Sequence, residues 1–279
     1  CNTLSLCYLC ISKILEMLRF ISFGSGSSGN CYLLQTDNSC LMIDSGVGVR
    51  ALKRFFHDYG ISFSCINNIL VTHDHADHVK SVGALSNESG IPVYATEAVH
   101  KGIQKNYCVR KKIEPSCVRV IEKGVEYQID EFKVTPFDVP HDSNDNVGYR
   151  IETQGIVFCL MTDIGHVTDD IKANIALADY LVIEANHDEA MLMSGPYPQY
   201  LKERVSGPYG HLSNRLCGET VAENASEHLK HVWLCHLSEE NNHPELVRKT
   251  IETLFHEKGL SVDVDILKRK TPTGFFDLV

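Results

Sequence analysis

The sequence predicts an α/β protein built as a single domain. Its 279 residues are 43% hydrophobic and 22% charged, a balance that suits a globular protein with a sizeable core. Short runs of aliphatic and β-branched residues, typical of buried strands, alternate with segments of helical character. No linker, low-complexity tract or block of like charge divides residues 17–279. Sheet-rich proteins of this length are often single domains, so we place one domain there.

The predicted elements follow one another along the whole of this domain. Strands are expected at 18–23, 31–35, 40–44, 69–72, 92–95, 118–121, 132–137, 147–152, 156–161, 180–183, 231–235 and 262–267. Helices are expected at 49–59, 79–87, 96–105, 169–178, 199–205, 214–225 and 244–258. Thr168 is suited to cap the helix at 169–178, and Pro244 suits the first turn of the last helix.

Residues 1–16 differ from the rest of the chain. They have no basic start and no small-residue cleavage site, and they are too short to span a membrane. Met17 is followed at once by a good strand. We therefore expect residues 1–16 to be an upstream or non-native extension, with a short N-terminal helix as the alternative.

Net charge and cysteine content limit the possible functions and the cellular location of the protein. A net charge of −10 is unexpected for a protein that binds nucleic acid, but net charge governs solubility and long-range steering and does not describe a local site. Divalent cations in a cleft can dominate the local potential. Eleven cysteines at irregular spacing do not form a disulfide framework, and they indicate a reducing, cytoplasmic location.

Four potential metal ligands lie within six positions directly after a predicted strand. They are His73, His75, Asp77 and His78. On an extended backbone His73 and His75 project to the same side, because side chains alternate with a period of two. The turn into the next helix can bring Asp77 and His78 back to the same point. Imidazole and carboxylate suit zinc, manganese or iron, whereas the alternative is a polar loop with solvated histidines.

This strand with its His-x-His-x-Asp-His segment resembles the signature of the metallo-β-lactamase superfamily. The resemblance implies an αββα sandwich with one or two metal ions at one edge, bound by loops at strand ends. Lactam, thioester and phosphodiester hydrolysis all occur on this architecture, so the reaction must be argued from the site.

Other strand ends resemble the remaining motifs of the superfamily. In its first motif, which Asp44-Ser-Gly matches, the Asp usually orients a metal-bound histidine through a hydrogen bond. Capping of the following turn is a compatible role for Asp44. His141, Asp163 and His236 each follow a predicted strand and resemble the later ligands, whereas His166 is a rival ligand whose default is an ordinary loop residue.

The resemblance implies a complete ligand set for two ions. One site is expected at His73, His75 and His141, and the other at Asp77, His78 and His236, with Asp163 shared. Two ions roughly 3.5–4 Å apart can hold a bridging hydroxide, which Asp77 could help to orient. We expect Zn²⁺ first, with Mn²⁺ or Fe²⁺ as alternatives.

Glu184-Ala185-Asn186 and Gly210-His211-Leu212-Ser213 point to the substrate class. They resemble the paired motifs of the nuclease branch, such as ribonuclease Z, in which a Glu-supported histidine donates a proton to the leaving oxygen. Asn186 stands where Thr is usual. This departure and the Gly-Ser-Gly-Ser-Ser-Gly-Asn loop at 24–30 resemble the YycJ (WalJ)-like group, associated with 5′-to-3′ exonuclease activity on DNA. The alternative for His211 is a residue that caps or packs at a helix N-terminus.

Several residues are candidates for contact with a nucleic-acid substrate. The glycine-rich loop at 24–30 could cradle a phosphate, although a plain hairpin loop would look the same. Aromatic and basic residues near 197–209 could stack on bases and meet phosphates, unless they simply pack on the domain. A basic run at 101–112 is a solvated face or a further phosphate contact. The substrate-binding residues that we predict are Ser27, Asn30, Tyr197, Lys202, Arg204, Tyr209 and Ser213.

Two other functions remain open from the sequence. One is a small-molecule hydrolase, either a glyoxalase II-like thioesterase or a lactamase-like enzyme. The other is a metal-binding regulator of cell-wall signalling without turnover. A dedicated leaving-group histidine argues against the first, and a full set of ligands argues against the second. The preferred function is a metal-dependent DNA exonuclease with Asp77, Glu184 and His211 as catalytic residues.

Overall fold

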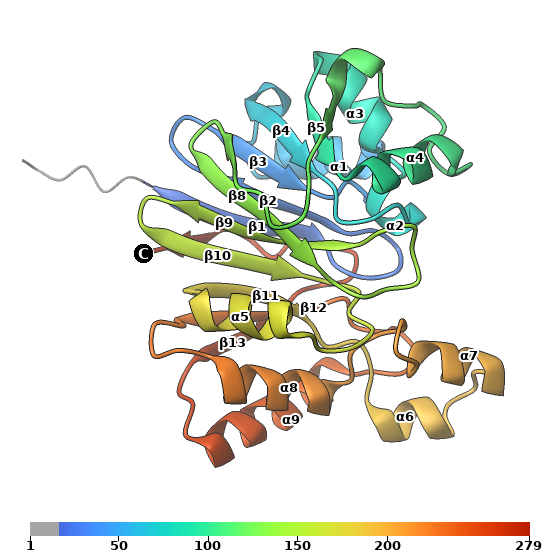
Figure 1. The fold of residues 1–279 in the computed structure, drawn as a ribbon, viewed down its shortest axis with the longest axis vertical. Helices are drawn as coiled ribbons and strands as arrows, with labels where there is room; N and C mark the ends of the chain where they lie inside the picture. The colour runs from blue at the N-terminus through green and yellow to red at the C-terminus, as the bar shows by residue number, and fades with distance from the viewer. Residues whose placement is uncertain (1–16) are drawn as a thin grey trace, which may run out of the picture.

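Two seven-stranded sheets lie face to face at the centre of the protein, and helices cover the outer side of each sheet (Figure 1). The computed structural model describes residues 17–279, so our expectation for residues 1–16 lies outside the described residues. The α/β class and the αββα sandwich predicted from the sequence are confirmed.

The first sheet has the strand order β14-β1-β2-β3-β4-β5-β6. Its strands are β1 (Leu18–Gly24), β2 (Cys31–Gln35), β3 (Cys40–Ile43), β4 (Ile66–Leu70), β5 (Val93–Ala95), β6 (Val118–Val120) and β14 (Phe276–Leu278). Pairing is antiparallel from β14 to β3 and parallel from β3 to β6. The carboxyl ends of β3 and β4 therefore meet at the same edge.

The second sheet has the order β13-β12-β11-β10-β9-β8-β7. Its strands are β7 (Tyr127–Ile129), β8 (Phe132–Asp138), β9 (Val147–Thr153), β10 (Ile156–Met161), β11 (Tyr180–Glu184), β12 (His231–Cys235) and β13 (Asp263–Ile266). Strands β10 to β13 run parallel, so the residues that follow β10, β11 and β12 also share one edge.

Helices complete the outer layers and one end of the molecule. They are α1 (Val49–Asp58), α2 (Ala76–Val79), α3 (Val82–Ser89), α4 (Glu97–Lys105), α5 (Asp169–Leu177), α6 (Glu189–Ser194), α7 (Gln199–Val205), α8 (Asn214–Asn224) and α9 (Pro244–Lys258). In Figure 1, α6 and α7 lie at the same end as α2. No helix among residues 17–279 has both the length and the apolar character needed to cross a membrane.

The apolar core is divided by the two sheets into three layers. Between the sheets, the rings of Phe20 and Trp233 lie 4.7 Å apart by their centroids. Leu52 and Phe56 of α1 pack on the outer face of the first sheet, and Ile171 of α5 packs on the second. Strands buried on both faces explain why the sequence shows continuous aliphatic runs in place of alternation.

Three details of the structure differ from the sequence prediction. The strand expected at 69–72 ends at Leu70, and the helix expected at 79–87 is divided into α2 and α3. The division occurs because Ser81 N donates to Ser45 O at 3.0 Å, and Ser81 Oγ donates to Val47 O at 2.7 Å. The elements β7, β14 and α6 were missed, because three to six residues are too few to establish a periodicity.

The loop after β3 approaches α2 so closely that only glycine fits at position 46. A Cβ atom built on Gly46 would lie 1.5 Å from Asp77 O. Asp77 and His78 therefore depend on this contact for their position. We expect Gly46→Ala to lower the melting temperature by roughly 3–10 °C, the effect of an overpacked site.

Thermal unfolding of Gly46→Ala beside Gly48→Ala provides the measurement. A Cβ on Gly48 would have nothing within 4 Å, so this control should unfold close to the original temperature. Equal melting temperatures for the two variants would contradict the close approach at Gly46.

Candidate active site

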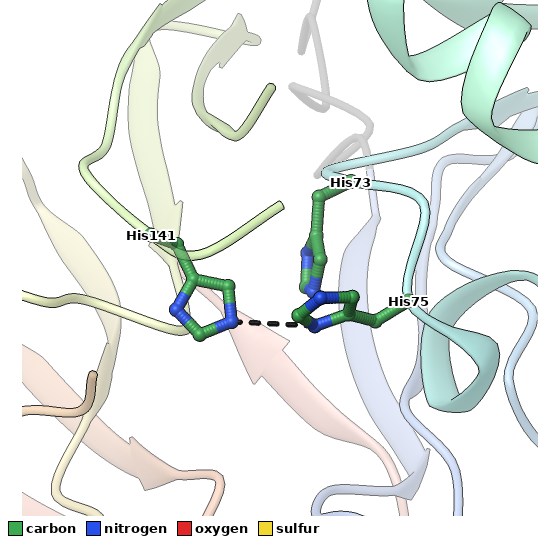
Figure 2. Close-up of side chains that lie close together, drawn as sticks. All are labelled: His73, His75 and His141. Atoms are coloured by element: carbon green, nitrogen blue, oxygen red, sulfur yellow. Dashed lines mark hydrogen bonds between the residues drawn. The ribbon is translucent and has the colours of Figure 1, made fainter. Parts of the chain in front are cut away.

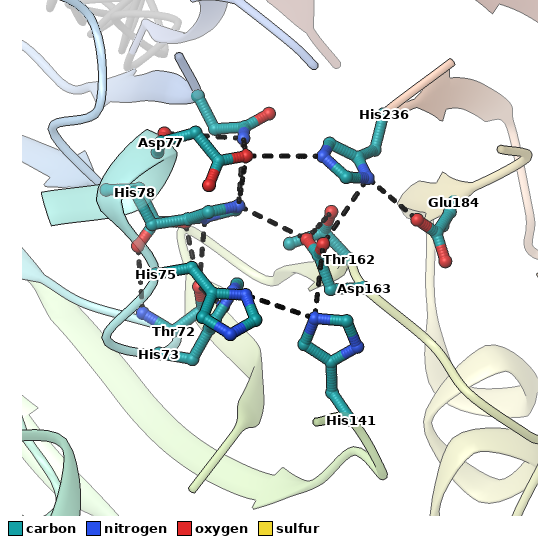
Figure 3. A network of polar contacts seen from close by, with 12 residues as sticks. Thr72, His73, His75, Asp77, His78, His141, Thr162, Asp163, Glu184 and His236 are labelled. Carbon is teal, nitrogen blue, oxygen red and sulfur yellow. Dashed lines mark hydrogen bonds and ion pairs between the residues drawn. The ribbon is translucent and has the colours of Figure 1, made fainter. Parts of the chain in front are cut away.

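Three polar residues stand within two positions of a strand end in an uncommon backbone conformation. Asp44, Asp163 and His236 follow β3, β10 and β12, with φ values of 57°, 56° and 53°. Few residues other than glycine adopt this left-handed region, and those that do cluster at functional sites. Figure 3 shows Asp163 and His236 directed at one another and toward Asp77 and His78. Strand ends from both sheets therefore supply one polar site.

The first group of donors contains His73, His75 and His141, from the loops after β4 and β8 (Figure 2). One ligand atom from each lies within 4.8 Å of the others. His141 Nδ1 lies 3.0 Å from Gly210 O, to which it can donate, and this fixes Nε2 as the nitrogen that faces His75 Nδ1 at 3.3 Å. Burial holds the pKa of His73 well below its usual value. Burial lowers the pKa of His141 as well, so His73 and His141 are predisposed to be neutral donors.

The second group contains Asp77, His78 and His236 (Figure 3). Asp77 and His78 lie on α2, where the sequence analysis expected the turn into a helix beginning at Val79, and His236 reaches them from the opposite sheet. Asp77 Oδ2 is 3.6 Å from His78 Nε2 and 3.5 Å from His236 Nε2.

Asp163 lies between the two groups. Its Oδ2 is 3.2 Å from His78 Nε2, and its Oδ1 is 3.7 Å from His141 Nε2. The structure therefore brings together all seven of the metal ligands that we predicted from the sequence. By contrast, His166 is exposed, and its Nδ1 lies 2.7 Å from Pro208 O, outside both donor groups.

Asp44 and Thr72 form hydrogen bonds that orient His78 in the second group. Asp44 Oδ2 is 2.7 Å from His78 Nδ1, which leaves Nε2 of that ring directed at Asp163. Thr72 donates to both Asp44 oxygens, from N and from Oγ1, at 2.9 Å each. Thr72 was not among the predicted site residues, and its only sequence signal is its position before His73.

The donor atoms fit divalent metal ions on two grounds. His73 Nε2 and His236 Nε2 are buried and have no hydrogen-bond partner in the described residues, which is unusual unless another group satisfies them. Secondly, the carboxylates create a strong demand for positive charge. Burial disfavours protonation of His78, but Asp44, Asp163 and Asp77 outweigh burial and raise its pKa to about 10. Cations held by these imidazole and carboxylate groups would meet that demand.

Glu184, at the end of β11, organises the side of the site next to Asp163. Its Oε1 lies 2.9 Å from His211 Nδ1 and 2.8 Å from His236 Nδ1. Its Oε2 accepts from Ile164 N and Leu212 N at 2.8 and 3.0 Å. Burial raises the pKa of Glu184, but His211 outweighs burial and lowers that pKa to about 2. An ionised Glu184 thus holds both histidines, and it raises the pKa of His211 against the effect of burial.

Two predicted substrate contacts do not lie where we expected them. Asn30 is fully buried, with its amide bonded to Gly26 and Asp77. Ser213 is buried as well, and its Oγ caps α8 by accepting from Leu216 N and donates to Glu189. These side chains support the site from within, and the expectation that they face a substrate is corrected. Ser27 is exposed on the loop between β1 and β2.

The predicted contacts near α7 are accessible but partly engaged. Tyr209 is 58% exposed and Tyr197 is half-buried. Lys202 Nζ donates to Met193 O at 2.6 Å, and Arg204 Nε donates to Asp142 Oδ2 at 2.6 Å. Both cations therefore already have a partner, whereas a free phosphate-binding group would have none.

Asp142 is a site residue that the sequence analysis did not select. Its Oδ1 is 3.3 Å from His141 Nε2 and 3.8 Å from His75 Nε2, while Oδ2 holds Arg204. It therefore connects α7 to the first donor group. Its position directly after His141 was the only available signal.

Comparison with known proteins agrees with this geometry. A family model described as "Beta-lactamase superfamily domain" matches residues 40–234. The structure superimposes on the crystal structure of the metallo-β-lactamase-fold protein YhfI from Bacillus subtilis with a TM-score of 0.70 and 18% identity, covering 92% of this chain and 99% of that one. The chain belongs to the metallo-β-lactamase superfamily.

Two curated relatives place the chain more narrowly. It is 32% identical over 245 residues to Exodeoxyribonuclease YycJ of Bacillus anthracis, covering 88% of this chain and 92% of that protein. It is also 32% identical over 247 residues to Exodeoxyribonuclease WalJ of Streptococcus pneumoniae, covering 88% and 91%. Within the superfamily, it belongs to the group that contains YycJ and WalJ.

Proposed function

We propose that this protein is a metal-dependent nuclease that degrades DNA from the 5′ end. The observation that carries the proposal is the pairing of two metal-donor groups with His211, a proton donor held by Glu184. The names of the relatives YycJ and WalJ, both exodeoxyribonucleases, support DNA as the substrate and removal of terminal nucleotides as the reaction.

In this proposal, seven residues hold two divalent ions. His73, His75 and His141 hold one, Asp77, His78 and His236 hold the other, and Asp163 contributes to both. Two such ions supply Lewis-acid stabilisation of the phosphoryl group and make hydroxide available near neutral pH. Zn²⁺ is the ion that we expect first, since both groups consist of the imidazole and carboxylate donors that zinc hydrolases use, and Mn²⁺ or Fe²⁺ remain alternatives.

The chain's own residues would orient the substrate and move a proton. Asp77, whose carboxylate is partly open to solvent, is suited to orient the attacking water by accepting a hydrogen bond. His211 Nδ1 is engaged by Glu184, which leaves Nε2 as the nitrogen that can donate to a leaving oxygen. The departing sugar oxygen develops negative charge, so a positioned acid lowers the barrier.

On the α7 side, exposed side chains would contact the nucleic acid. Tyr200 and Tyr209 are 73% and 58% exposed and offer faces on which bases can stack. Tyr197, Lys202 and Arg204 complete this expected surface, and Ser27 is the contact that we expect on the loop between β1 and β2. Arg204 would have to exchange Asp142 for a phosphate oxygen, so its contribution depends on a carboxylate beside the first donor group. A cytoplasmic location is part of the proposal and is supported by the eight free cysteines of the described residues.

A direct test uses 24-nucleotide DNA strands labelled at one end and protected by phosphorothioates at the other. With metal-loaded protein, we expect mononucleotides from strands with a free 5′ end and little product from strands protected there. RNA of the same sequence, a thioester and a β-lactam are run beside them. Turnover of the thioester or lactam without turnover of DNA would favour a small-molecule hydrolase. Stoichiometric metal with no turnover of any substrate would favour a regulator.

A further inference from the structure

A concentrated patch of positive charge follows α4, although the chain as a whole carries −10. Between residues 98 and 113 there are five lysines and arginines and no acidic residue: Lys101, Lys105, Arg110, Lys111 and Lys112. Lys101 pairs with Glu97, and Lys112 Nζ donates to backbone oxygens. Lys105, Arg110 and Lys111 are exposed, and none of them forms an ion pair with a described residue. We call residues 105–112 the α4 tip.

Tyr107, within the α4 tip, is 91% exposed, more than any other large hydrophobic residue of the described chain. The backbone around it is held firmly. Lys112 Nζ donates to Asn106 O at 2.7 Å, and Asn106 Oδ1 accepts from Cys108 N at 2.9 Å. The ring therefore projects into solvent from an ordered turn, and its exposure does not come from a loose segment.

The α4 tip is fastened to the loop that carries the metal donors. Asn106 Nδ2 donates to Asp74 O at 2.7 Å, and Asp74 stands between His73 and His75. A Cβ on Gly102 would lie 2.0 Å from Asp74 Oδ2, so glycine allows α4 to rest directly on this loop. In the view of Figure 1, α4 lies on one side of α2 and α7 lies on the other.

We propose that the α4 tip binds the unpaired nucleic-acid strand next to the active site, with a base stacked on Tyr107 and phosphates held by Lys105, Arg110 and Lys111. The proposal rests on the proposed nuclease function and adds a second contact on the side opposite α7. An aromatic face surrounded by unpaired cations matches a single strand, since each nucleotide offers a base face and a phosphate. In a duplex the base faces are covered by stacking, so Tyr107 would have no partner there.

Binding of a 12-nucleotide phosphorothioate DNA strand, which resists cleavage, tests the tip separately from catalysis. Metal-loaded protein is titrated by fluorescence anisotropy at several salt concentrations. We expect Tyr107→Ala to weaken binding by about 5- to 150-fold, the range for one base–aromatic stack. Tyr107→Phe retains a ring and should bind nearly as the original protein does. The triple variant Lys105→Ala, Arg110→Ala, Lys111→Ala should lower the salt slope by about 2, since each phosphate contact contributes roughly 0.7.

Lys249→Ala on α9 is the matched control, because it removes an exposed cation from the outer helical layer. It should leave both affinity and salt slope unchanged. If Tyr107→Ala and the triple variant bind the strand as Lys249→Ala does, the tip proposal is overturned. A blunt duplex bound as tightly as the single strand, and equally by Tyr107→Ala, would overturn it as well. A different result would contradict the nuclease proposal: the unmodified protein would fail to cleave ordinary DNA, whatever the α4 tip binds.

Discussion

Asp163→Asn is expected to lower the metal content by at least one ion per chain and to reduce DNA hydrolysis on the order of 1,000-fold. The carboxylate faces both donor groups, at 3.2 Å from His78 Nε2 and 3.7 Å from His141 Nε2. Its loss would remove a negative charge that both ions require. Metal ions supply several kcal/mol of transition-state stabilisation, and each 1.36 kcal/mol corresponds to a tenfold change in rate.

The substitution is chosen so that the fold is retained. Asparagine has the same shape as aspartate and tolerates the left-handed conformation that Asp163 adopts. Asp130→Asn is a matched control, because Asp130 also has a positive φ, of 48°, but stands in the turn between β7 and β8. Elemental analysis and rates are measured on both proteins. Full metal content in Asp163→Asn, or an equal loss in Asp130→Asn, would show that Asp163 does not bridge the two groups.

How far the site could be predicted depended on sequence distance. His73, His75, Asp77 and His78 share one strand end and one turn, so local spacing alone indicated a metal site. His141, Asp163 and His236 carry no such local signal. Their meeting depends on the order of strands in two sheets, and only the family resemblance indicated it in advance.

Residues whose role depends on tertiary contacts were beyond the sequence analysis. Asn30 belongs to a glycine-rich loop that resembles a phosphate cradle, yet its side chain is buried against Asp77. The pairing of Asp142 with Arg204 joins residues 62 positions apart. This pairing depends on the position of α7. That helix comes after α6, which is too short to be recognised in the sequence.

The left-handed backbone at Asp44, Asp163 and His236 was also invisible in the sequence. Asp, Asn and His visit this region more readily than other residues, but the tertiary structure decides which of them adopt it. A strained backbone of this kind persists where the surrounding strands hold it in place, and here both sheets do so. The α4 tip was predictable only in part for the same reason. Its basic composition was apparent from the sequence, whereas its attachment to Asp74 depends on the tertiary structure.

The same geometry makes His211 the residue whose removal should discriminate between substrates. In a normal phosphodiester the departing sugar oxygen needs a proton, and a positioned acid contributes roughly 100- to 10,000-fold. We therefore expect His211→Ala to lose activity in that range on DNA. On a phosphodiester with a p-nitrophenolate leaving group the loss should be small, because that group departs without a proton. Rates on the two substrates, with metal content measured on the same preparations, provide the comparison.

Two further variants separate proton donation from a structural role. His166→Ala removes a nearby exposed histidine that lies outside both donor groups, and it should retain nearly full activity on both substrates. Glu184→Gln keeps an acceptor for His211 Nδ1 but removes the charge that raises the pKa of His211, so its loss on DNA should fall between those of the other two variants. Because Glu184 also contacts His236 Nδ1, its result counts only where metal content is unchanged. Equal losses on the two substrates in metal-replete His211→Ala would mean that His211 positions the substrate or the donor groups, and the leaving-group proton would have to come from elsewhere.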